Sequence, residues 1–228
     1  MSNADPAPWE WLFAGRYTGF TLTLTRGLTV DELLERYGAD RSAARPLPFA
    51  EIDGALQSDN EHAVLRVGAL GEWAFGIEDS GVQGAAPTTL AQLSRGTETI
   101  SVYNGANALQ IFEYWLDGNP RERFEPGMTS TLRAAGSHPF WDAAERQHAA
   151  RPETRSILSV MRAVEDHIQA RLAQETDDGA LLTLLLPQTR PMEPSPVPPL
   201  PLVNPPSNRT GVGRHLATLR LPGNQSGD

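Results

Sequence analysis

Residues 96–127 read GTETISVYNGANALQIFEYWLDGNPRERFEPG, and this stretch decides the fold. Three segments in it have the β-branched and aromatic content or the spacing of strands: residues 97–103, 109–116 and 121–125. Asn104-Gly105 and Asp117-Gly118 stand between them, and such pairs adopt the positive φ of tight hairpin turns at little steric cost. The stretch therefore predicts three consecutive antiparallel strands, a β-meander.

Composition limits the chemistry that the chain can perform. The 228 residues include no cysteine, which excludes disulfides, thiolate nucleophiles and cysteine-based metal sites. The N-terminal residues lack the basic and apolar regions of a secretory signal. The longest apolar run, residues 180–187, is far short of the roughly 20 residues that span a bilayer. We therefore expect a cytoplasmic protein that does not bind membranes.

The charge is strongly acidic and unevenly distributed. All 19 basic residues are arginine, and the formal net charge is −9. Residues 187–228 hold four arginines and two acids, a net of +2, so the remaining residues carry −11. An acidic body argues against nucleic-acid binding, which needs clustered Lys and Arg. It suits solubility, or a partner protein that is basic.

The rest of the chain predicts an α+β protein. Alternation indicates strands at residues 17–25, 62–70 and 72–77, and the meander would extend these to an antiparallel sheet of five to six strands. Apolar residues at helical spacing indicate helices that would pack on this sheet: residues 30–37, 88–94, 139–149 and 152–174. Residues 40–60 indicate a loop. Beyond Gly127 the sequence pattern becomes helical. Residues 180–186 suit either a strand or a helix.

The domain boundary falls where proline becomes frequent. We expect a single domain over residues 1–186 and a disordered, proline-rich tail over residues 187–228. Nine of the twenty residues from Pro187 to Pro206 are proline. The tail contains the PxxP spacing that polyproline-reading domains bind, although tails of this composition also occur without a reader.

Three segments carry a resemblance to a known family: RGLTVDELLERYGA (residues 26–39), GEWAFGIEDSG (residues 71–81) and LSRGTETISVY with FEYWLDGNPRERFEPG (within residues 93–127). Together they resemble an uncharacterised actinobacterial family, a domain of unknown function. The resemblance covers roughly residues 9–186 and implies a cytoplasmic bacterial protein of the same α+β kind. It implies no catalytic residue, because the family has no assigned activity.

Motifs for catalysis, metals and cofactors are missing from the sequence. No Gly-x-Ser-x-Gly elbow, His-Glu-x-x-His pair or calcium loop is present. The histidines are scattered over different predicted elements: His62, His138, His148, His167 and His215. We therefore predict no catalytic residue, no metal and no cofactor.

The candidate site residues are aromatic and acidic side chains of the predicted sheet. Glu78, Glu98, Glu113 and Glu125 lie on or beside strands, and Glu113 shares a strand face with Ile111 and Trp115. Such carboxylates serve either as structural ion pairs, for example with Arg121 or Arg123, or as acid–base groups. The aromatic side chains suit either the core or a recognition surface. The binding candidates are Trp73, Glu78, Asp79, Tyr103, Glu113 and Trp115.

Two functions fit these residues. The first is a non-enzymatic protein-interaction module, immunity-like or antitoxin-like, that binds a basic partner through an acidic, aromatic-rich sheet. The alternative is a small-ligand-binding or hydrolytic enzyme domain that uses sheet carboxylates. A deep cavity with converging polar groups would favour the enzyme, whereas a filled core and a partly apolar sheet face would favour the interaction module. The sequence indicates neither the partner nor the oligomeric state.

Overall fold

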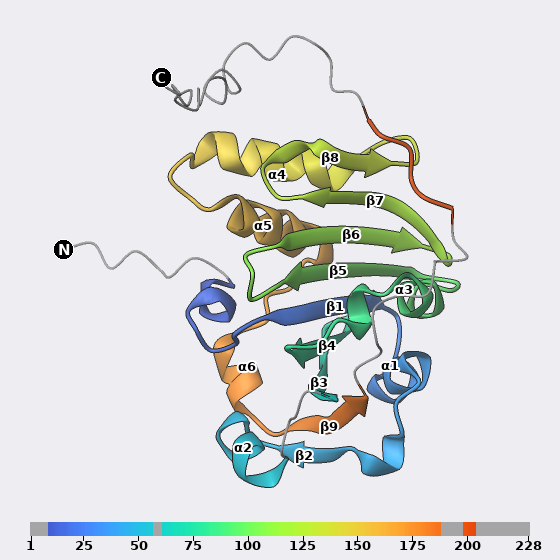
Figure 1. Ribbon diagram of the computed structural model, residues 1–228, viewed down its shortest axis with the longest axis vertical. Helices are drawn as coiled ribbons and strands as arrows, with labels where there is room; N and C mark the ends of the chain where they lie inside the picture. Colours follow the sequence, from blue (N-terminus) through green and yellow to red (C-terminus); the bar gives the residue numbers. More distant parts are fainter. Residues whose placement is uncertain (1–8, 57–60, 188–197, 204–228) are drawn as a thin grey trace, which may run out of the picture.

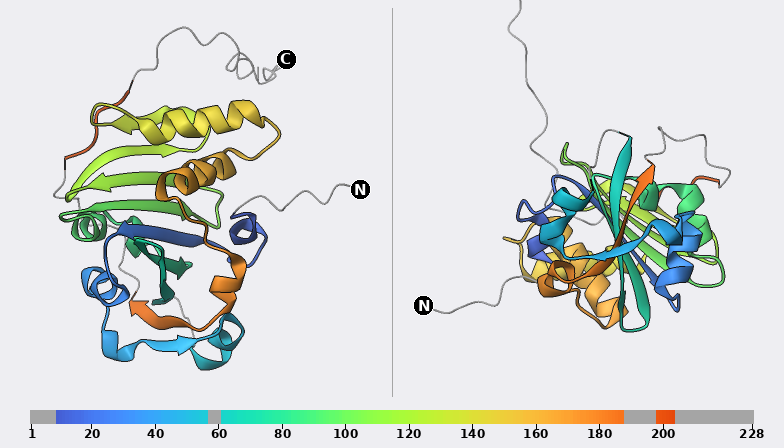
Figure 2. Two further views of the ribbon diagram at one scale, coloured as in Figure 1. Left: turned by 180° about the vertical axis from the view of Figure 1, so that it is seen from behind. Right: turned by 90° about the horizontal axis from the view of Figure 1, so that it is seen from below.

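The computed structural model describes residues 9–56, 61–187 and 198–203 (Figure 1). One antiparallel sheet runs through the whole molecule, with helices on both of its faces (Figures 1 and 2). Its strands are β1 (Phe20–Arg26), β2 (Arg45–Leu47), β3 (His62–Leu70), β4 (Trp73–Asp79), β5 (Glu98–Asn104), β6 (Gln110–Leu116), β7 (Asn119–Glu125), β8 (Met128–Ala134) and β9 (Leu181–Pro187). The predicted α+β class is confirmed.

Six α-helices and four short 3₁₀ helices connect the strands of the described chain. The α-helices are α1 (Val30–Tyr37), α2 (Ile52–Ala55), α3 (Pro87–Leu93), α4 (Pro139–Ala150), α5 (Ser156–Ile168) and α6 (Gln174–Asp178). The 3₁₀ helices are η1 (Glu10–Phe13), η2 (Arg41–Ala43), η3 (Phe49–Glu51) and η4 (Gln83–Ala85).

The sheet has the strand order β2-β9-β3-β4-β1-β5-β6-β7-β8. The predicted meander is confirmed, because β5, β6 and β7 pair with their neighbours in sequence. β8 continues it as a fourth strand, although the sequence pattern after Gly127 indicated helix. The segment Met128–Ala134 (MTSTLRA) has few apolar residues. Its strand is therefore defined by its pairing with β7 and not by an alternation of apolar and polar residues.

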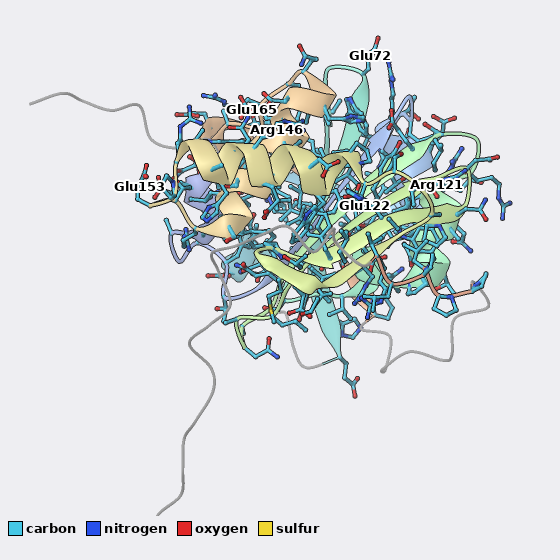
Figure 3. The ribbon with its side chains drawn as sticks, turned by 90° about the horizontal axis from the view of Figure 1, so that it is seen from above. Glu72, Arg121, Glu122, Arg146, Glu153 and Glu165 are labelled. Atoms are coloured by element: carbon cyan, nitrogen blue, oxygen red, sulfur yellow. The ribbon has the colours of Figure 1, made fainter. Side chains whose placement is uncertain are left out.

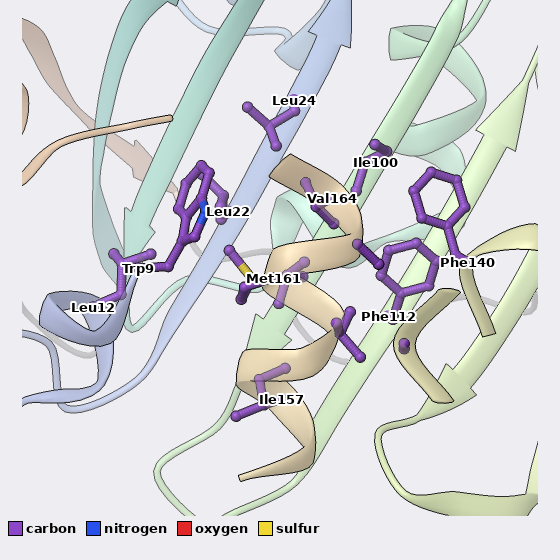
Figure 4. Close-up of a cluster of buried hydrophobic side chains, with 14 of the residues drawn as sticks. Trp9, Leu12, Leu22, Leu24, Ile100, Phe112, Phe140, Ile157, Met161 and Val164 are labelled. Carbon is purple, nitrogen blue, oxygen red and sulfur yellow. The ribbon is translucent and has the colours of Figure 1, made fainter. Parts of the chain in front are cut away.

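Helices cover the two halves of the sheet on opposite faces. α4 and α5 lie against the half that contains β5–β8 (Figures 1 and 2). α1 and α3 lie on the other face, where α1 contacts β3 and β4 and α3 contacts β5 (Figure 1). The larger core lies beneath α4 and α5, where Ile157, Met161 and Val164 of α5 approach β1 and β5 (Figure 4). The smaller core contains Leu33, Leu34 and Tyr37 of α1. The central strands are therefore buried on both faces.

Local sequence signals explain several boundaries. Thr29 and Glu32 form the predicted capping box of α1, in which the Thr29 hydroxyl accepts from the Glu32 amide at 3.2 Å. Gly38 ends this helix with a φ of 72°. Asp117 and Gly118 both have positive φ, as a tight hairpin turn requires. In the β5–β6 turn, positive φ falls on Ala108 rather than on the predicted Asn104-Gly105 pair.

Two further strands were not recognised as such in the sequence. β2 lies within the predicted loop of residues 40–60, and its three residues include a proline, which is tolerated at a sheet edge. Residues 180–186, which suited a strand or a helix, form β9 and lie between β2 and β3. With these additions the described sheet has nine strands rather than the predicted five to six.

Part of the proline-rich tail also meets the sheet. Residues 198–203 run past the end of β8, and Leu202 forms an antiparallel bridge with Arg133 (Figure 1). The prediction of disorder for the rest of residues 187–228 falls on residues 188–197 and 204–228, which lie outside the described part.

Candidate functional site

The buried carboxylate of Glu78 anchors a loop. Its two oxygens accept backbone N–H groups of η4, at 2.9 Å from Gln83 and at hydrogen-bond distance from Gly84, and Tyr37 donates to it at 3.2 Å. Ser101 holds the same loop through a 2.8 Å bond to the Gly84 carbonyl. Because Glu78 is fully enclosed and has three donors, its role in this arrangement is structural.

Glu113, one of the sheet carboxylates that the enzyme alternative would use, is also buried. It is 7% exposed, and it accepts from the Trp115 indole at 2.8 Å and from Arg123 at 3.3 Å. The predicted cross-strand pairing with Arg123 is confirmed, since the two residues stand opposite each other on β6 and β7. Trp115 is 2% exposed. Both side chains are therefore buried on the sheet, and neither lines an open pocket.

Glu122 is a third enclosed carboxylate, and the sequence reasoning did not single it out. It lies where β7 meets the first turn of α4 (Figure 3). Its carboxylate accepts the backbone N–H groups of Phe140 at 3.1 Å and Trp141 at 2.6 Å. These N–H groups have no partner within the helix, so Glu122 satisfies them and faces the positive end of the helix dipole. In the sequence, Glu122 could have been noticed because it stands two residues before the apolar Phe124 and therefore shares its strand face.

Two of these carboxylates should make stability depend on pH. Burial raises the pKa of Glu78 and of Glu122 to about 7, and their hydrogen bonds only partly oppose this. The folded protein then binds these protons more tightly than the unfolded chain, whose carboxyls titrate near 4.5. Stability should therefore increase as the pH falls from 7 towards 4.5.

The replacement Glu122→Gln should weaken this pH dependence by on the order of 2 kcal/mol between pH 7.5 and 5. Urea unfolding at a series of pH values measures it, with Glu125→Gln on the same strand as the control. An unchanged pH dependence in Glu122→Gln would show that Glu122 ionises normally in the folded protein.

Polar groups converge at the surface around Glu98. Its Oε2 atom lies 3.0 Å from the Tyr114 hydroxyl and 3.0 Å from Nε2 of His167, and its Oε1 accepts from Arg26 at 3.3 Å. The His167 ring contacts three aromatic rings, with centroid distances of 5.9 Å to Trp73, 6.1 Å to Tyr114 and 4.8 Å to Phe140.

We call Glu98, Tyr114 and His167 the Glu98 cluster. The Glu98 side chain is 11% exposed and that of His167 is 36% exposed, so solvent reaches the imidazole. Burial, followed by the Glu98 charge, raises the pKa of Tyr114 to about 12, which keeps the phenol protonated at neutral pH. A histidine beside a carboxylate can transfer protons, although the same bonds also join α5 to the sheet.

The six predicted binding residues do not form one site. Tyr103, Glu113 and Trp115 share the sheet face opposite α4 and α5. Glu78 shares that face on β4, and β1 separates it from Tyr103. Trp73 lies on the other face beside His167, and Asp79 lies at the end of β4. Of the six, Trp73 contacts the Glu98 cluster, through the ring of His167. His167 was missed because it is 69 residues from Glu98 in sequence, and no local spacing links the two.

Two hollows among the described residues are small. One, lined by Trp141, His148 and Ser159, holds about 10 Å³, close to the least volume that a single water molecule needs. The other, beside Glu78 and Val82, has no room for a water molecule. Small-molecule pockets usually have roughly 300 Å³ or more. Within residues 9–56, 61–187 and 198–203, no group of three or more His, Asp or Glu side chains could hold a metal ion.

The fold and its enclosed carboxylates define an α+β protein built on a single antiparallel sheet. The chain belongs to a family of unknown function (DUF6461), whose model matches residues 4–149. The match ends within α4, so α5, α6 and β9 follow the matched region. No curated protein and no solved structure matched the chain. In the part of the chain that the structure describes, no helix is long and apolar enough to cross a membrane.

Proposed function

We propose that the chain is a non-enzymatic protein-interaction module that works in the cytoplasm. Glu78, Glu113 and Glu122 all accept hydrogen bonds inside the protein, and the hollows are too small for a metabolite. These observations favour recognition at the surface over chemistry in a pocket.

One observation carries the proposal: half of the sheet has helices on one face only. Figure 1 shows β6, β7 and β8 with no described helix in front of them, while α4 and α5 lie behind. We call four side chains on this side the open face: Tyr103, Ile111, Arg123 and Arg133. Glu113 and Trp115 lie on the same side but are buried. Of the four, Arg123 is exposed and the other three are half-buried. An aromatic ring, an aliphatic side chain and arginines are the residue types that interfaces favour.

The charge distribution bears on the partner. Residues 1–186 carry a net charge of −11, and a field of this sign attracts a protein that is basic overall. Exposed acids occur elsewhere, for example Asp31, Glu32 and Glu35 of α1. An acid on the same side as the open face, Glu113, is buried and paired with Arg123. The basic partner would therefore present polar or acidic groups where it meets Arg123 and Arg133. An immunity-like or antitoxin-like role is one instance of this function.

Matched substitutions on one strand test the proposal. The full chain serves as bait for extracts of its source organism, and captured proteins are identified by mass spectrometry. Ile111→Asp places a charge on the open face and should reduce capture of the specific partner at least tenfold. Leu116→Asp changes an exposed leucine on the other face of β6 and should leave capture unchanged. Equal capture by both variants, or no specific partner for the unaltered chain, would refute the proposal.

The Glu98 cluster supports a second candidate function, binding or hydrolysis of a small molecule. The Tyr114 hydroxyl and His167 Nε2 each lie 3.0 Å from the same oxygen of Glu98, and the imidazole is accessible. A thermal-shift screen of small molecules on the full chain distinguishes the two functions. A stabilising molecule whose effect is lost in His167→Ala would favour this candidate over the interaction module.

A further inference from the structure

The outer edge of β8 is occupied by the chain itself. The Ala134 amide donates to the Pro201 carbonyl at 3.2 Å, and the Val203 amide donates to the Leu132 carbonyl at 3.1 Å. Between these bonds Leu202 stands opposite Arg133. We call residues 200–203 the edge segment. It adds a short antiparallel strand to a sheet that would otherwise end at β8, where an unpaired strand offers free N–H and C=O groups.

The edge segment is a poor match for the groups that it covers. In this register the pairs Ala134/Pro201 and Leu132/Val203 can each exchange two backbone hydrogen bonds. Pro201 has no amide hydrogen, so it cannot donate to the Ala134 carbonyl. A segment with an amide hydrogen at this position would pair with β8 more completely.

We propose that the β8 edge is a binding site for an extended peptide of a partner protein, and that the edge segment occupies this site until the partner displaces it. Addition of a strand to a free sheet edge is a common mode of peptide recognition, in which main-chain bonds give affinity and side chains give specificity. The incomplete pairing makes the edge segment a replaceable occupant.

The side chains around the edge define the peptide. Val203 packs against the core beneath α4 and α5, which calls for an apolar residue at this place. Leu202 is 52% exposed and faces Arg133 across the bridge, so an acidic residue there would form a cross-strand ion pair. The partner segment therefore has an acidic and then an apolar residue, preceded by a residue with an amide hydrogen where this chain has Pro201.

This inference deepens the proposed function, because it gives the module a binding mode and a means of regulation. Its test uses a synthetic peptide and needs no natural partner. If the peptide does not bind, the proposal for the β8 edge fails, but capture of a partner at the open face can still succeed. If no partner is captured, the peptide measurement still tests the β8 edge.

The test compares two proline substitutions in the full chain. The probe is the fluorescent peptide TLTEVNTT, which is residues 199–206 with threonine at the four prolines and glutamate at the Leu202 position. Val203→Pro removes the bond to Leu132 and should raise the affinity for this peptide five- to tenfold, because a larger fraction of molecules has a free edge. Leu202→Pro is the matched control, since the amide of Leu202 points away from β8 and donates no bond to it. Its affinity should stay near that of the unaltered chain.

Amide hydrogen exchange gives a second readout. The Ala134 amide should exchange faster in Val203→Pro than in the unaltered chain, and the added peptide should restore its protection. No peptide binding to Val203→Pro, or equal affinity in both proline variants, would overturn the proposal. A dimer of the unaltered chain that Val203→Pro dissociates would assign the edge to the tail of a second copy instead, and would also overturn it.

Discussion

Asp177→Ala should lower the free energy of unfolding by about 3–5 kcal/mol, the cost of leaving a buried charge without its partner. Asp177 is fully buried and accepts from Arg66 at 3.0 Å, Arg16 at 2.7 Å and Tyr17 at 2.8 Å. Arg66 is itself 1% exposed, so without Asp177 its guanidinium would remain enclosed with neutral acceptors only.

The neighbouring residue provides the control. Asp178 also pairs with Arg16, at 2.8 Å, but its side chain is 52% exposed. Asp178→Ala should therefore cost less than about 1 kcal/mol. Urea unfolding at neutral pH measures both variants. If Asp177→Ala and Asp178→Ala lowered the free energy of unfolding equally, the buried ion pair between α6 and β3 would contribute no more to stability than the exposed one.

Gly84→Ala should destabilise the protein by about 3 kcal/mol, although it adds only one methyl group. The new Cβ would clash with the Tyr37 hydroxyl and lie 2.6 Å from Glu78 Oε1 and 2.7 Å from Thr23 Cγ2. None of these neighbours can easily retreat, because Glu78 is bonded to η4 and Tyr37 is bonded to Thr23 at 2.7 Å. The cost combines overpacking with the loss of donors to a buried carboxylate.

Gly54→Ala is the matched control for this substitution. A Cβ on Gly54 in α2 would have no atom within 4 Å, and alanine is the better helix former. We expect stabilisation by up to about 1 kcal/mol. Thermal unfolding distinguishes the two variants directly. A Gly84→Ala protein as stable as the unaltered chain would mean that η4 can move away from Glu78 at little cost.

The elements that the sequence predicts well are those with local signals. The capping box of α1, the Asp117-Gly118 turn and the apolar stripe of α5 each depend on residues close together in the chain. β8 was wrongly assigned to a helical region because its strand character depends on β7. β9 stayed ambiguous because an apolar run of this length suits a strand or a helix until its neighbours are known.

The candidate site was less predictable than the fold. Glu113 was expected to pair with Arg121 or Arg123, and it pairs with Arg123, because cross-strand neighbours in a hairpin follow from the register. The Glu98–His167 contact and the Arg66–Asp177 pair join residues 69 and 111 positions apart. No local spacing encodes such distances. Glu98 was among the candidate carboxylates, whereas Glu122 was not. Its position on the apolar face of a strand, two residues before Phe124, is the sequence feature that could have indicated it.

The position of β9 between β2 and β3 has a consequence during synthesis. The meander and α4 and α5 are made of residues that follow one another in the chain, so this half of the sheet can form while the ribosome is still translating. The other half cannot close, because Leu181–Pro187 must first emerge and insert beside strands made more than a hundred residues earlier. Until then β3 exposes a long, apolar edge to neighbouring nascent chains, and a ribosome that stalls before Leu181 would release a molecule prone to aggregation.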